Sequence, residues 1–371
     1  MHTSTIHFLG GAGTVTGSNF LLDTGKEKIL IDCGLFQGEH VVADANWGPF
    51  AFDPTEIPFL INTHAHIDHI GRIPKLVRDG FRGKIISTEA TRALAEPMLL
   101  DALSLARVAA KHIGKEAFYD EHDITQALSQ WEGISYHQKV ELVDGFSVEL
   151  LDSGHILGSA MARFTRGEKV VVFTGDLGGG NSPLLSPCET LNDVDYLVME
   201  SVYGDRMRDP AEKGSSNRLS ALENIIEDSA KRGGTLLIPA FSTERTQDIL
   251  FEIRSLMLEK RVPQIPVYLD SPLAEKITAS YVAHPKYFNE AIQKRMAEGE
   301  HIFEFPGLHY VHDNAESQKV GASQGAKIIL AGSGMSNGGR ILSHEHDLLS
   351  DESATLLIVG YQAAGSLGRR L

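Results

Sequence analysis

Few cysteines and no long apolar run mark this chain, and both shortages exclude whole classes of protein. Its 371 residues include only Cys33 and Cys188, too few for a disulfide framework and suited to a reducing compartment. No apolar stretch approaches the roughly 20 residues that a membrane helix needs. Residues 1–8 lack the charged and apolar regions of a signal peptide. We therefore expect a cytoplasmic protein with no membrane partner.

Positive charge is also in short supply. The chain has 34 Lys and Arg against 49 Asp and Glu, which gives a net charge of −15. This balance argues against a basic surface that coats nucleic acid. A polyanionic substrate would instead need a local positive site, and bound metal ions can supply one. The length of 371 residues is long for one domain and predicts two.

The most informative segment that is present is His64–His69, with the sequence HAHIDH. It follows the apolar run 57–61, which the pattern predicts to be a buried strand. His64 and His66 then point to one side of an extended segment, and Asp68 and His69 lie on the turn beyond it. Each pair can bind one of two neighbouring metal ions, for which zinc is suited and manganese or iron are alternatives. The competing interpretation is a polar strand end whose histidines only form hydrogen bonds.

Three other predicted strand ends carry ligand-type side chains. His155 follows the strand 148–151, and Asp176 follows the strand 170–174, each on a loop with glycine. His155 can complete a three-histidine set with His64 and His66, and Asp176 can bridge two metal ions. Asp32, at the end of a further strand, is expected to orient a ligand, with a structural turn as the close alternative.

The hydrophobic pattern predicts two kinds of architecture along the chain. In the first half, strands dominate and predict a sheet packed on a sheet with helices outside. These strands lie at 5–8, 18–22, 29–32, 59–62, 84–87, 139–142, 148–151, 160–164 and 170–174, with helices at 91–112 and 124–131. In the second half, helices and strands alternate, which predicts a parallel sheet with crossover helices. The helices are expected at 217–232, 246–260 and 273–282, and the strands at 236–239, 267–270, 327–330 and 355–359.

The order of these motifs resembles the metallo-β-lactamase superfamily. The segments 200–204 (ESVYG), 239–247 (PAFSTERTQ), 270–274 (DSPLA), 332–340 (GSGMSNGGR) and 360–368 (GYQAAGSLG) are similar to the β-CASP insert of its nucleic-acid-processing members. The resemblance implies an α/β (α+β) fold. Residues 1–205 would form an αββα sandwich with a dinuclear metal site on one edge, and residues 206–371 an inserted β-CASP domain with a mainly parallel sheet.

The resemblance also implies a site that holds two zinc ions, with manganese as the alternative. The first ion would take His64, His66 and His155, and the second Asp68 and His69, with Asp176 and a hydroxide between them. The hydroxide would attack phosphorus. The expected catalytic residues are Asp68, Asp176 and Glu200. Glu200 and Asp32 are also expected to orient ligand side chains from behind.

The chain resembles most the bacterial and archaeal relatives of the endonuclease subunit of the pre-mRNA 3′-end cleavage complex. The implied activity is hydrolysis of RNA phosphodiester bonds in single-stranded RNA, endonucleolytic and also 5′-exonucleolytic. Two alternatives stay open. A small-molecule metallohydrolase, such as a thioesterase or lactonase, would share the metal motif but not residues 200–368. A non-catalytic RNA-binding subunit would usually have lost ligands that are all present here.

Residues for RNA contact are expected in the second half. The glycine-rich segment 332–340 can turn its N–H groups toward a phosphate. The candidates are Ser333, Gly334, Met335, Ser336, Gly338, Gly339 and Arg340. Arg245 can pair with the RNA backbone. Phe241 is either a base-stacking ring or a core residue.

One departure from the family concerns the segment after residue 368. There the family has two further histidine motifs, one of which supplies the last ligand of the second metal ion. This chain ends at Leu371, before both, so we expect a weak second metal site. The first domain would then have an open sheet edge prone to association, with a homodimer as one outcome. Ser343–Asp347 is expected to be a solvated helix face and not a substitute.

Overall fold

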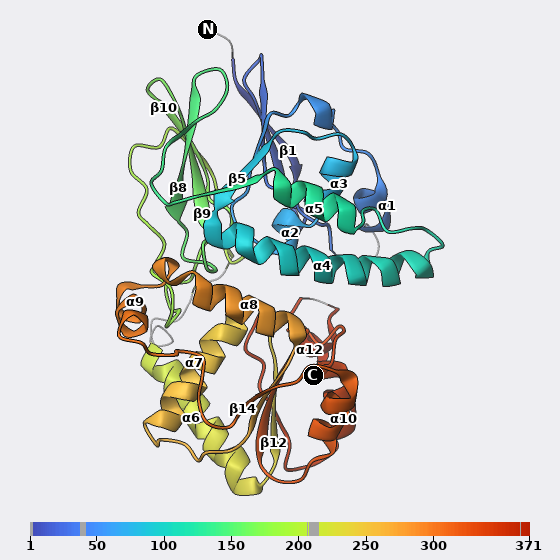
Figure 1. The fold of residues 1–371 in the computed structure, drawn as a ribbon, viewed down its shortest axis with the longest axis vertical. Helices are drawn as coiled ribbons and strands as arrows, with labels where there is room; N and C mark the ends of the chain where they lie inside the picture. Colours follow the sequence, from blue (N-terminus) through green and yellow to red (C-terminus); the bar gives the residue numbers. More distant parts are fainter. Residues whose placement is uncertain (1–2, 38–41, 206, 208–214, 364) are drawn as a thin grey trace. The chain divides into compact units, whose positions relative to one another are not determined.

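The computed structural model describes residues 3–37, 42–205, 207, 215–363 and 365–371 (Figure 1). It divides into two compact units. Unit 1 comprises Met1–Gly180 and Ser186–Arg206, and unit 2 comprises Asn181–Leu185 and Met207–Leu371. Among the described residues, no helix is long and apolar enough to cross a membrane.

Unit 1 contains two sheets. The first has the order β1-β2-β3-β4-β5-β6, antiparallel from β1 to β3 and parallel from β3 to β6. Its strands are β1 (Thr5–Gly10), β2 (Asn19–Asp23), β3 (Lys28–Ile31), β4 (Phe59–Ile61), β5 (Lys84–Thr88) and β6 (Trp131–Ile134). The second has the order β11-β10-β9-β8-β7, with only the β10–β11 pair parallel. Its strands are β7 (Val140–Glu141), β8 (Phe146–Asp152), β9 (Ala160–Arg166), β10 (Lys169–Phe173) and β11 (Tyr196–Val198).

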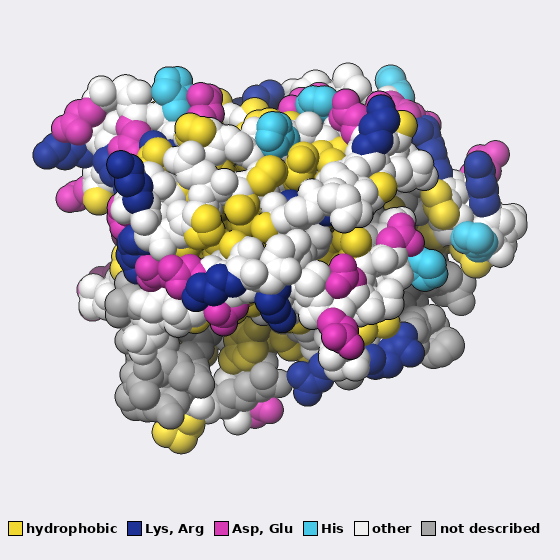
Figure 2. All heavy atoms as spheres, turned by 90° about the horizontal axis from the view of Figure 1, so that it is seen from below, with side chains coloured by type: hydrophobic (Ala, Val, Ile, Leu, Met, Phe, Trp, Pro, Cys, Tyr) yellow, Lys and Arg dark blue, Asp and Glu magenta, His cyan; other side chains and the backbone are white. Residues whose placement is uncertain are grey.

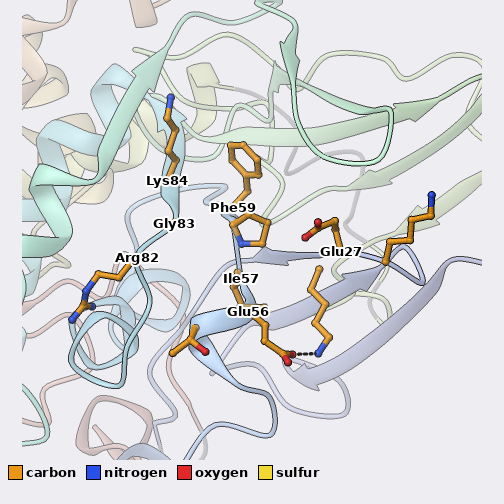
Figure 3. A pocket seen from close by; sticks show the side chains of 11 residues that line it. Glu27, Glu56, Ile57, Phe59, Arg82, Gly83 and Lys84 are labelled. Atoms are coloured by element: carbon orange, nitrogen blue, oxygen red, sulfur yellow. Dashed lines mark hydrogen bonds and ion pairs between the residues drawn. The ribbon is translucent and has the colours of Figure 1, made fainter.

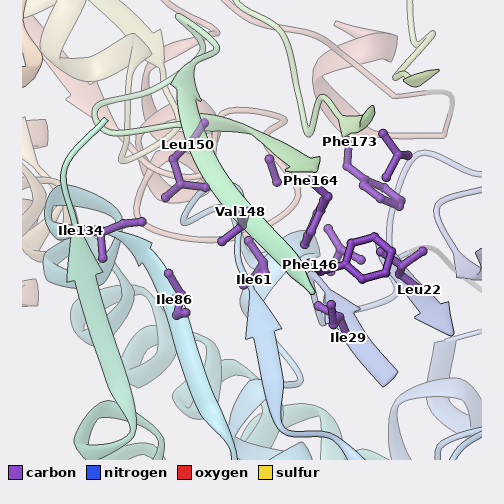
Figure 4. Packing of buried hydrophobic residues seen from close by; sticks show 14 residues of the cluster. Leu22, Ile29, Ile61, Ile86, Ile134, Phe146, Val148, Leu150, Phe164 and Phe173 are labelled. Atoms are coloured by element: carbon purple, nitrogen blue, oxygen red, sulfur yellow. The ribbon is translucent and has the colours of Figure 1, made fainter. Parts of the chain in front are cut away.

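The core of unit 1 lies between these two sheets. Figure 4 shows Ile29, Ile61 and Ile86 of the first sheet packed with Val148 and Leu150 of the second. Val148 and Leu150 are two residues apart, so both point to the same face of β8. All five side chains are buried, and each such side chain contributes roughly 1.5–3 kcal/mol to folding. The predicted sandwich is confirmed.

Helices cover the outer face of the first sheet, as Figure 1 shows for α4 and α5. The helices of unit 1 are α1 (Val42–Trp47), η1 (Pro54–Glu56), α2 (Ile67–Ile70), α3 (Ile73–Arg78), α4 (Glu89–His112) and α5 (Glu121–Ser129). The prediction that helix 124–131 includes Trp131 is wrong. Trp131 begins β6, because its indole Nε1 donates to Ser87 Oγ of β5 at 2.9 Å and fixes it beside that strand. The outer face of the second sheet is covered by apolar side chains from the extended segment 177–194.

Unit 2 is built on one fully parallel sheet with the order β14-β13-β15-β12-β16. Its strands are β12 (Thr235–Pro239), β13 (Val267–Asp270), β14 (Leu308–Tyr310), β15 (Lys327–Ala331) and β16 (Thr355–Leu356). Its helices are α6 (Ser215–Arg232), α7 (Arg245–Leu258), α8 (Pro272–Ala283), η3 (Pro285–Tyr287), α9 (Glu290–Ala297), α10 (Asn314–Ala322), α11 (Ile341–Leu348) and α12 (Leu367–Arg370). Every residue of β12 and β15 is buried, as expected for central parallel strands covered on both faces. Figure 1 shows α6 and α7 on one side of this sheet and α10 on the other. The parallel sheet is confirmed.

One prediction in unit 2 is wrong for two residues. Ser343–Asp347 lies on α11 as expected, but His344 and Glu345 are buried instead of solvated. His344 Nε2 lies 2.7 Å from Asp270 Oδ2. Glu345 Oε1 accepts a hydrogen bond from Ser336 Oγ. Asp270 is 74 residues from His344, and Ser336 lies in the loop before the helix, so the local polarity of the helix gave no sign of these partners.

Figure 2 shows one face, on which acidic, basic and histidine side chains are interspersed around a region of hydrophobic side chains. Lys and Arg do not gather into one patch among the described side chains of this face. This agrees with the excess of 49 acidic over 34 basic residues.

Candidate metal centre

The segment His64–His69 sits where β4 passes into α2. β4 ends at Ile61, and α2 begins at Ile67 with His66 as its extended N-cap residue. His64 and His66 therefore precede the helix, and Asp68 and His69 lie in its first turn. β4 is held between β3 and β5, which fixes the start of this turn.

Two loops of the second sheet bring His155 and Asp176 to the same place. His155 follows β8, and Asp176 follows β10. The two loops touch, because Gly178 N donates to Ser153 O at 2.9 Å. A Cβ at Gly178 would lie 1.8 Å from Gly154 O, so only glycine permits this approach. The sandwich thus joins residues that are about 90 positions apart in sequence.

His64, His66 and His155 form a set of converging nitrogens. His66 Nδ1 lies 3.1 Å from His64 Nε2 and 3.1 Å from His155 Nε2. Asp176 Oδ2 lies 3.9 Å from His64 Nε2 and 3.6 Å from His155 Nε2. A tetrahedral zinc ion with bonds of about 2.0–2.1 Å places its ligand atoms roughly 3.3 Å apart. The donors and their spacing therefore fit such an ion.

Asp68 and His69 form a second set on the other side of Asp176. His69 Nε2 lies 3.3 Å from Asp176 Oδ1 and 4.0 Å from Asp68 Oδ2. Asp176 thus turns Oδ2 toward the three histidines and Oδ1 toward His69. With one oxygen toward each set, this carboxylate would be able to contact an ion held by either set.

Asp32 lies directly behind His69. Its Oδ2 is 2.7 Å from His69 Nδ1, and its Oδ1 accepts from Thr63 N at 2.8 Å and Asn62 Nδ2 at 2.9 Å. The Thr63 hydroxyl also lies 3.1 Å from His64 Nδ1. Asn62, Thr63 and Ser18, which bonds to Asp32 Oδ2 at 3.4 Å, are site residues that the sequence reasoning missed. The signal for Asn62 and Thr63 was their position, directly between the strand and His64.

Burial and neighbouring charge separate the pKa values of these groups. Burial, followed by the charge of His69, holds the pKa of His64 well below its usual value. Burial and His155 lower the pKa of His66 to about 3. Both rings are therefore neutral at neutral pH and keep a lone pair for a metal ion. Burial acts the same way on His69, but the carboxylates of Asp176 and Asp32 outweigh it and hold the pKa of His69 well above its usual value.

Glu200 lies just beyond β11, beside the loop that carries Asp176. Its backbone N donates to Thr174 Oγ1 at 3.2 Å, and its Oε2 accepts from Val202 N at 2.8 Å. Its predicted contact with a ligand histidine is not among these bonds. The role of Glu200 in orienting a ligand stays a prediction.

The residues predicted to contact RNA lie in unit 2. Arg340 donates to Asp270 Oδ1 at 2.6 Å and to the carbonyls of Val311 and His312 at 2.9 and 3.0 Å. Arg245 lies 3.2 Å from a Glu244 oxygen and 3.7 Å from an Asp248 oxygen. Both guanidinium groups therefore have partners within the protein, and their phosphate contacts stay predictions.

The segment from Ser333 to Gly339 forms one loop after β15. Several of its groups bond within the protein. Ser333 N donates to Gly338 O, Ser336 N to Ser333 O, and Asn337 N to Ser333 Oγ, each at 3.1 Å. Gly334 and Met335 use their carbonyl oxygens to accept from Gln362 and Gly368. A phosphate role for this loop also stays a prediction.

An open groove of about 850 Å³ lies at the other end of the parallel strands of unit 1 (Figure 3). It is lined by residues at the amino ends of β3, β4 and β5, whereas the histidines follow the carboxyl end of β4. Lys28 pairs with Glu56, and Lys84 lies 3.4 Å from a Glu132 oxygen. The groove is thus separate from the metal centre.

Comparisons with known proteins agree with this geometry. The profile of the metallo-beta-lactamase superfamily matches residues 12–232, and that of the Beta-Casp domain matches residues 246–371. Ribonuclease TTHA0252 from Thermus thermophilus is 36% identical over 362 residues, which cover 98% of this chain and 80% of that protein. Transcription termination factor FttA from Methanosarcina mazei is 33% identical over 373 residues, and the match spans 98% of this chain but 57% of the factor. A crystal structure of a protein of unknown function from Enterococcus faecalis shares the fold, with a TM-score of 0.55 at 13% identity over 97% of this chain and 88% of that one.

Proposed function

Because the chain belongs to the metallo-beta-lactamase superfamily and carries a Beta-Casp domain, we propose that it is a metal-dependent ribonuclease. Its proposed substrate is single-stranded RNA, cleaved to 5′-phosphate ends by endonucleolytic and 5′-exonucleolytic attack. The observation that carries the proposal is Asp176, whose two oxygens face two separate donor sets. Residues 1–205 are proposed as the metallo-β-lactamase part and residues 206–371 as the β-CASP part.

Two zinc ions suit the donors, with manganese as the alternative. His64, His66 and His155 would hold one ion, Asp68 and His69 the other, and Asp176 both. When bound, the ions supply an activated water and positive charge for the phosphodiester. The residues of the chain itself would orient the side chains that bind the ions.

The side chains that would orient the ligands lie behind them, on the side away from the centre. Asp32 would accept from His69 Nδ1, so that a metal ion displacing the Nε2 proton would find the Nε2 lone pair directed at the centre. Thr63 bonds to both Asp32 oxygens, at 3.1 and 2.9 Å, and so holds that carboxylate in place. Glu200 is proposed to orient a ligand histidine from the loop beside Asp176.

Two further features belong to the proposal. The name of the ribonuclease from Thermus thermophilus supports RNA as substrate and, with it, a cytoplasmic location. Tyr196 and Leu197 on β11, the edge strand of its sheet, are exposed by 62% and 49%. We propose that this edge forms the contact in a homodimer. The molar mass of the protein, measured by light scattering as it elutes from a size-exclusion column, would test this.

The decisive experiment incubates 5′-labelled single-stranded RNA with the protein, with and without a chelator, and maps both product ends. We expect cleavage that stops with chelator and leaves 5′-phosphates. Asp68→Asn and Asp176→Asn should lower the rate by orders of magnitude while RNA affinity stays nearly unchanged. Asp53→Asn is the matched control, since Asp53 is exposed and caps only Thr55. Rapid hydrolysis of a lactone or thioester without RNA cleavage would overturn the proposal.

A further inference from the structure

The connections of the parallel sheet in unit 2 reverse direction at its centre. β12 and β15 are neighbours. From β12 the chain runs through α7 across β15 to β13, and from β15 it runs through α11 across β12 to β16. In open parallel sheets, ligands bind outside the carboxyl ends of the strands at such a reversal. The loops 240–244 and 332–340 follow these two strand ends and flank this position.

Phe241 is the aromatic residue of this crevice, and 36% of it is exposed. Glycine backbone lies along one edge of its ring, the edge that carries Cδ2 and Cε2. A Cβ at Gly334 would be 2.8 Å from Phe241 Cδ2, and a Cβ at Gly360 would be 3.5 Å from Cε2. Only glycine fits at position 334, so the chain leaves room for the ring beside the loop. Phe241 is thus neither a core residue nor a loosely placed surface ring.

The backbone around Phe241 is held from both sides of the crevice. Thr246 Oγ1 donates to Phe241 O at 2.7 Å, and Gln247 Nε2 donates to Ser242 O at 3.1 Å. Gln362 Nε2 donates to Gly334 O at 2.7 Å. A side chain on a backbone fixed in this way is preorganised for a ligand.

Two serine hydroxyls lie at the same strand ends, one of them on the residue that follows Phe241. Ser242 Oγ and Ser271 Oγ are 3.5 Å apart. Both lie about 4 Å from where a Cβ of Gly332 would stand, at 4.0 and 3.9 Å, so there is space between them and Gly332. Ser271 Oγ also accepts from Ala274 N, and because one serine of the pair donates to the other, one hydroxyl proton remains to donate.

The charges nearby do not favour a phosphate at this spot. Arg340 is bonded to Asp270, and Arg245 is paired with Glu244. An aromatic face with hydroxyl donors and acceptors suits a flat, uncharged ring with polar edges. A nucleobase has this chemistry.

We propose that this crevice is a nucleobase subsite, in which one base of single-stranded RNA stacks on Phe241 and bonds to Ser242 and Ser271. The proposal rests on the proposed function, because it takes RNA as the substrate. It also reassigns the loop 332–340, which here shapes the base pocket and positions the ring.

The test measures binding of a labelled single-stranded RNA to the full chain in chelator, so that cleavage plays no part. Phe241→Leu keeps an apolar side chain but removes the aromatic face, and we expect roughly 5- to 100-fold weaker binding. Phe241→Tyr should bind as the wild type does. The dependence of affinity on salt should be the same in all three proteins, because stacking releases no counterions.

Two controls make the result specific. Phe288→Leu changes a buried aromatic of the same unit and should leave RNA affinity unchanged. An RNA without bases should bind equally weakly to the wild type and to Phe241→Leu, because the lost contact is the base itself. If Phe241→Leu loses its native unfolding transition, Ser242→Ala carries the test, with an expected loss of roughly 2- to 10-fold.

The outcomes separate the two proposals. Equal binding of base-containing RNA by the wild type, Phe241→Leu and Ser242→Ala would overturn the subsite even if chelator-sensitive cleavage is present. Absence of RNA cleavage by the wild type would overturn the proposed function instead. A steeper or shallower salt dependence in Phe241→Leu would show that the residue acts through charge contacts and would refute stacking.

Discussion

Asp32→Asn is the substitution that probes the metal centre most sharply, because it changes one atom behind a ligand and touches no ligand. Asp32 is fully buried and has φ 53°. Asn is one of the few residues that tolerates this left-handed backbone, so the turn should persist. The change therefore tests the hydrogen bonds of the carboxylate alone.

The structure predicts which way the new amide will face. At the Oδ1 position it would meet two donors, Thr63 N at 2.8 Å and Asn62 Nδ2 at 2.9 Å. At the Oδ2 position it would meet His69 Nδ1 at 2.7 Å and the hydroxyls of Thr63 and Ser18 at 2.9 and 3.4 Å. The second orientation opposes no fixed N–H donor, because a hydroxyl can rotate to accept and the ring proton can move to the other nitrogen. The amide then donates to His69 Nδ1 and moves the ring proton to Nε2, the atom that faces Asp176.

The expected cost follows from this tautomer. A ligand held in the wrong tautomer loses roughly 10- to 100-fold in metal affinity, which is about 1.4–2.7 kcal/mol. Competition with a chromophoric chelator would resolve two affinities, and only the weaker second site should change. Asp53→Asn is the control, because Asn caps a helix as well as Asp does. Two unchanged affinities in Asp32→Asn would refute the assignment of Asp32 as the residue that sets the ring of His69.

Three further predictions concern other parts of the chain. His66→Ala should lower bound metal by about one ion per chain in elemental analysis, since this ring stands within 3.1 Å of both other histidines of its set; unchanged metal content would contradict the first site. Burial and then the Glu244 carboxylate raise the pKa of Asp248 to about 7, so its contribution to stability is fully present below about pH 4, the unfolded pKa, and is lost as the pH rises to 7. Asp248→Asn keeps an acceptor for Ser182 and should flatten the fall in urea stability between about pH 4 and about pH 7; an unchanged slope would contradict the raised pKa. Phe164→Ala, in the sandwich core at 0% exposure, should cost about 3–5 kcal/mol in denaturant unfolding, and a loss below about 1 kcal/mol would show that the core collapses around the gap.

The sequence was most informative where chemistry is local. The apolar run at 57–61 predicted the buried strand β4, because a short continuous run of apolar side chains is typical of a strand covered on both faces. The helix predicted at 124–131 extends beyond its observed end, because α5 ends at Ser129 and Trp131 begins β6. Its end depended on a hydrogen bond to Ser87, 44 residues away, which no local pattern contains.

Partners from distant segments explain the other differences. The polar run at 343–347 is typical of a solvated helix face, yet His344 is buried against Asp270, 74 residues away. The guanidinium of Arg340 is bonded to Asp270 and two carbonyl oxygens, partners that the local sequence did not indicate, and its contact with a phosphate stays a prediction. A single sequence gives the residue type at each position but not the partner.

By itself, the sequence determined which groups are able to bind metal, because the ligand types and their strand-end positions are written in HAHIDH, His155 and Asp176. Only the tertiary structure decided that they meet, since two separate sheets must pack before His155 Nε2 comes within 3.1 Å of His66 Nδ1. It also decided which oxygen of Asp176 faces which set and which carboxylate stands behind His69. These are distances between segments, and they are fixed by the packing of the core and not by any local pattern.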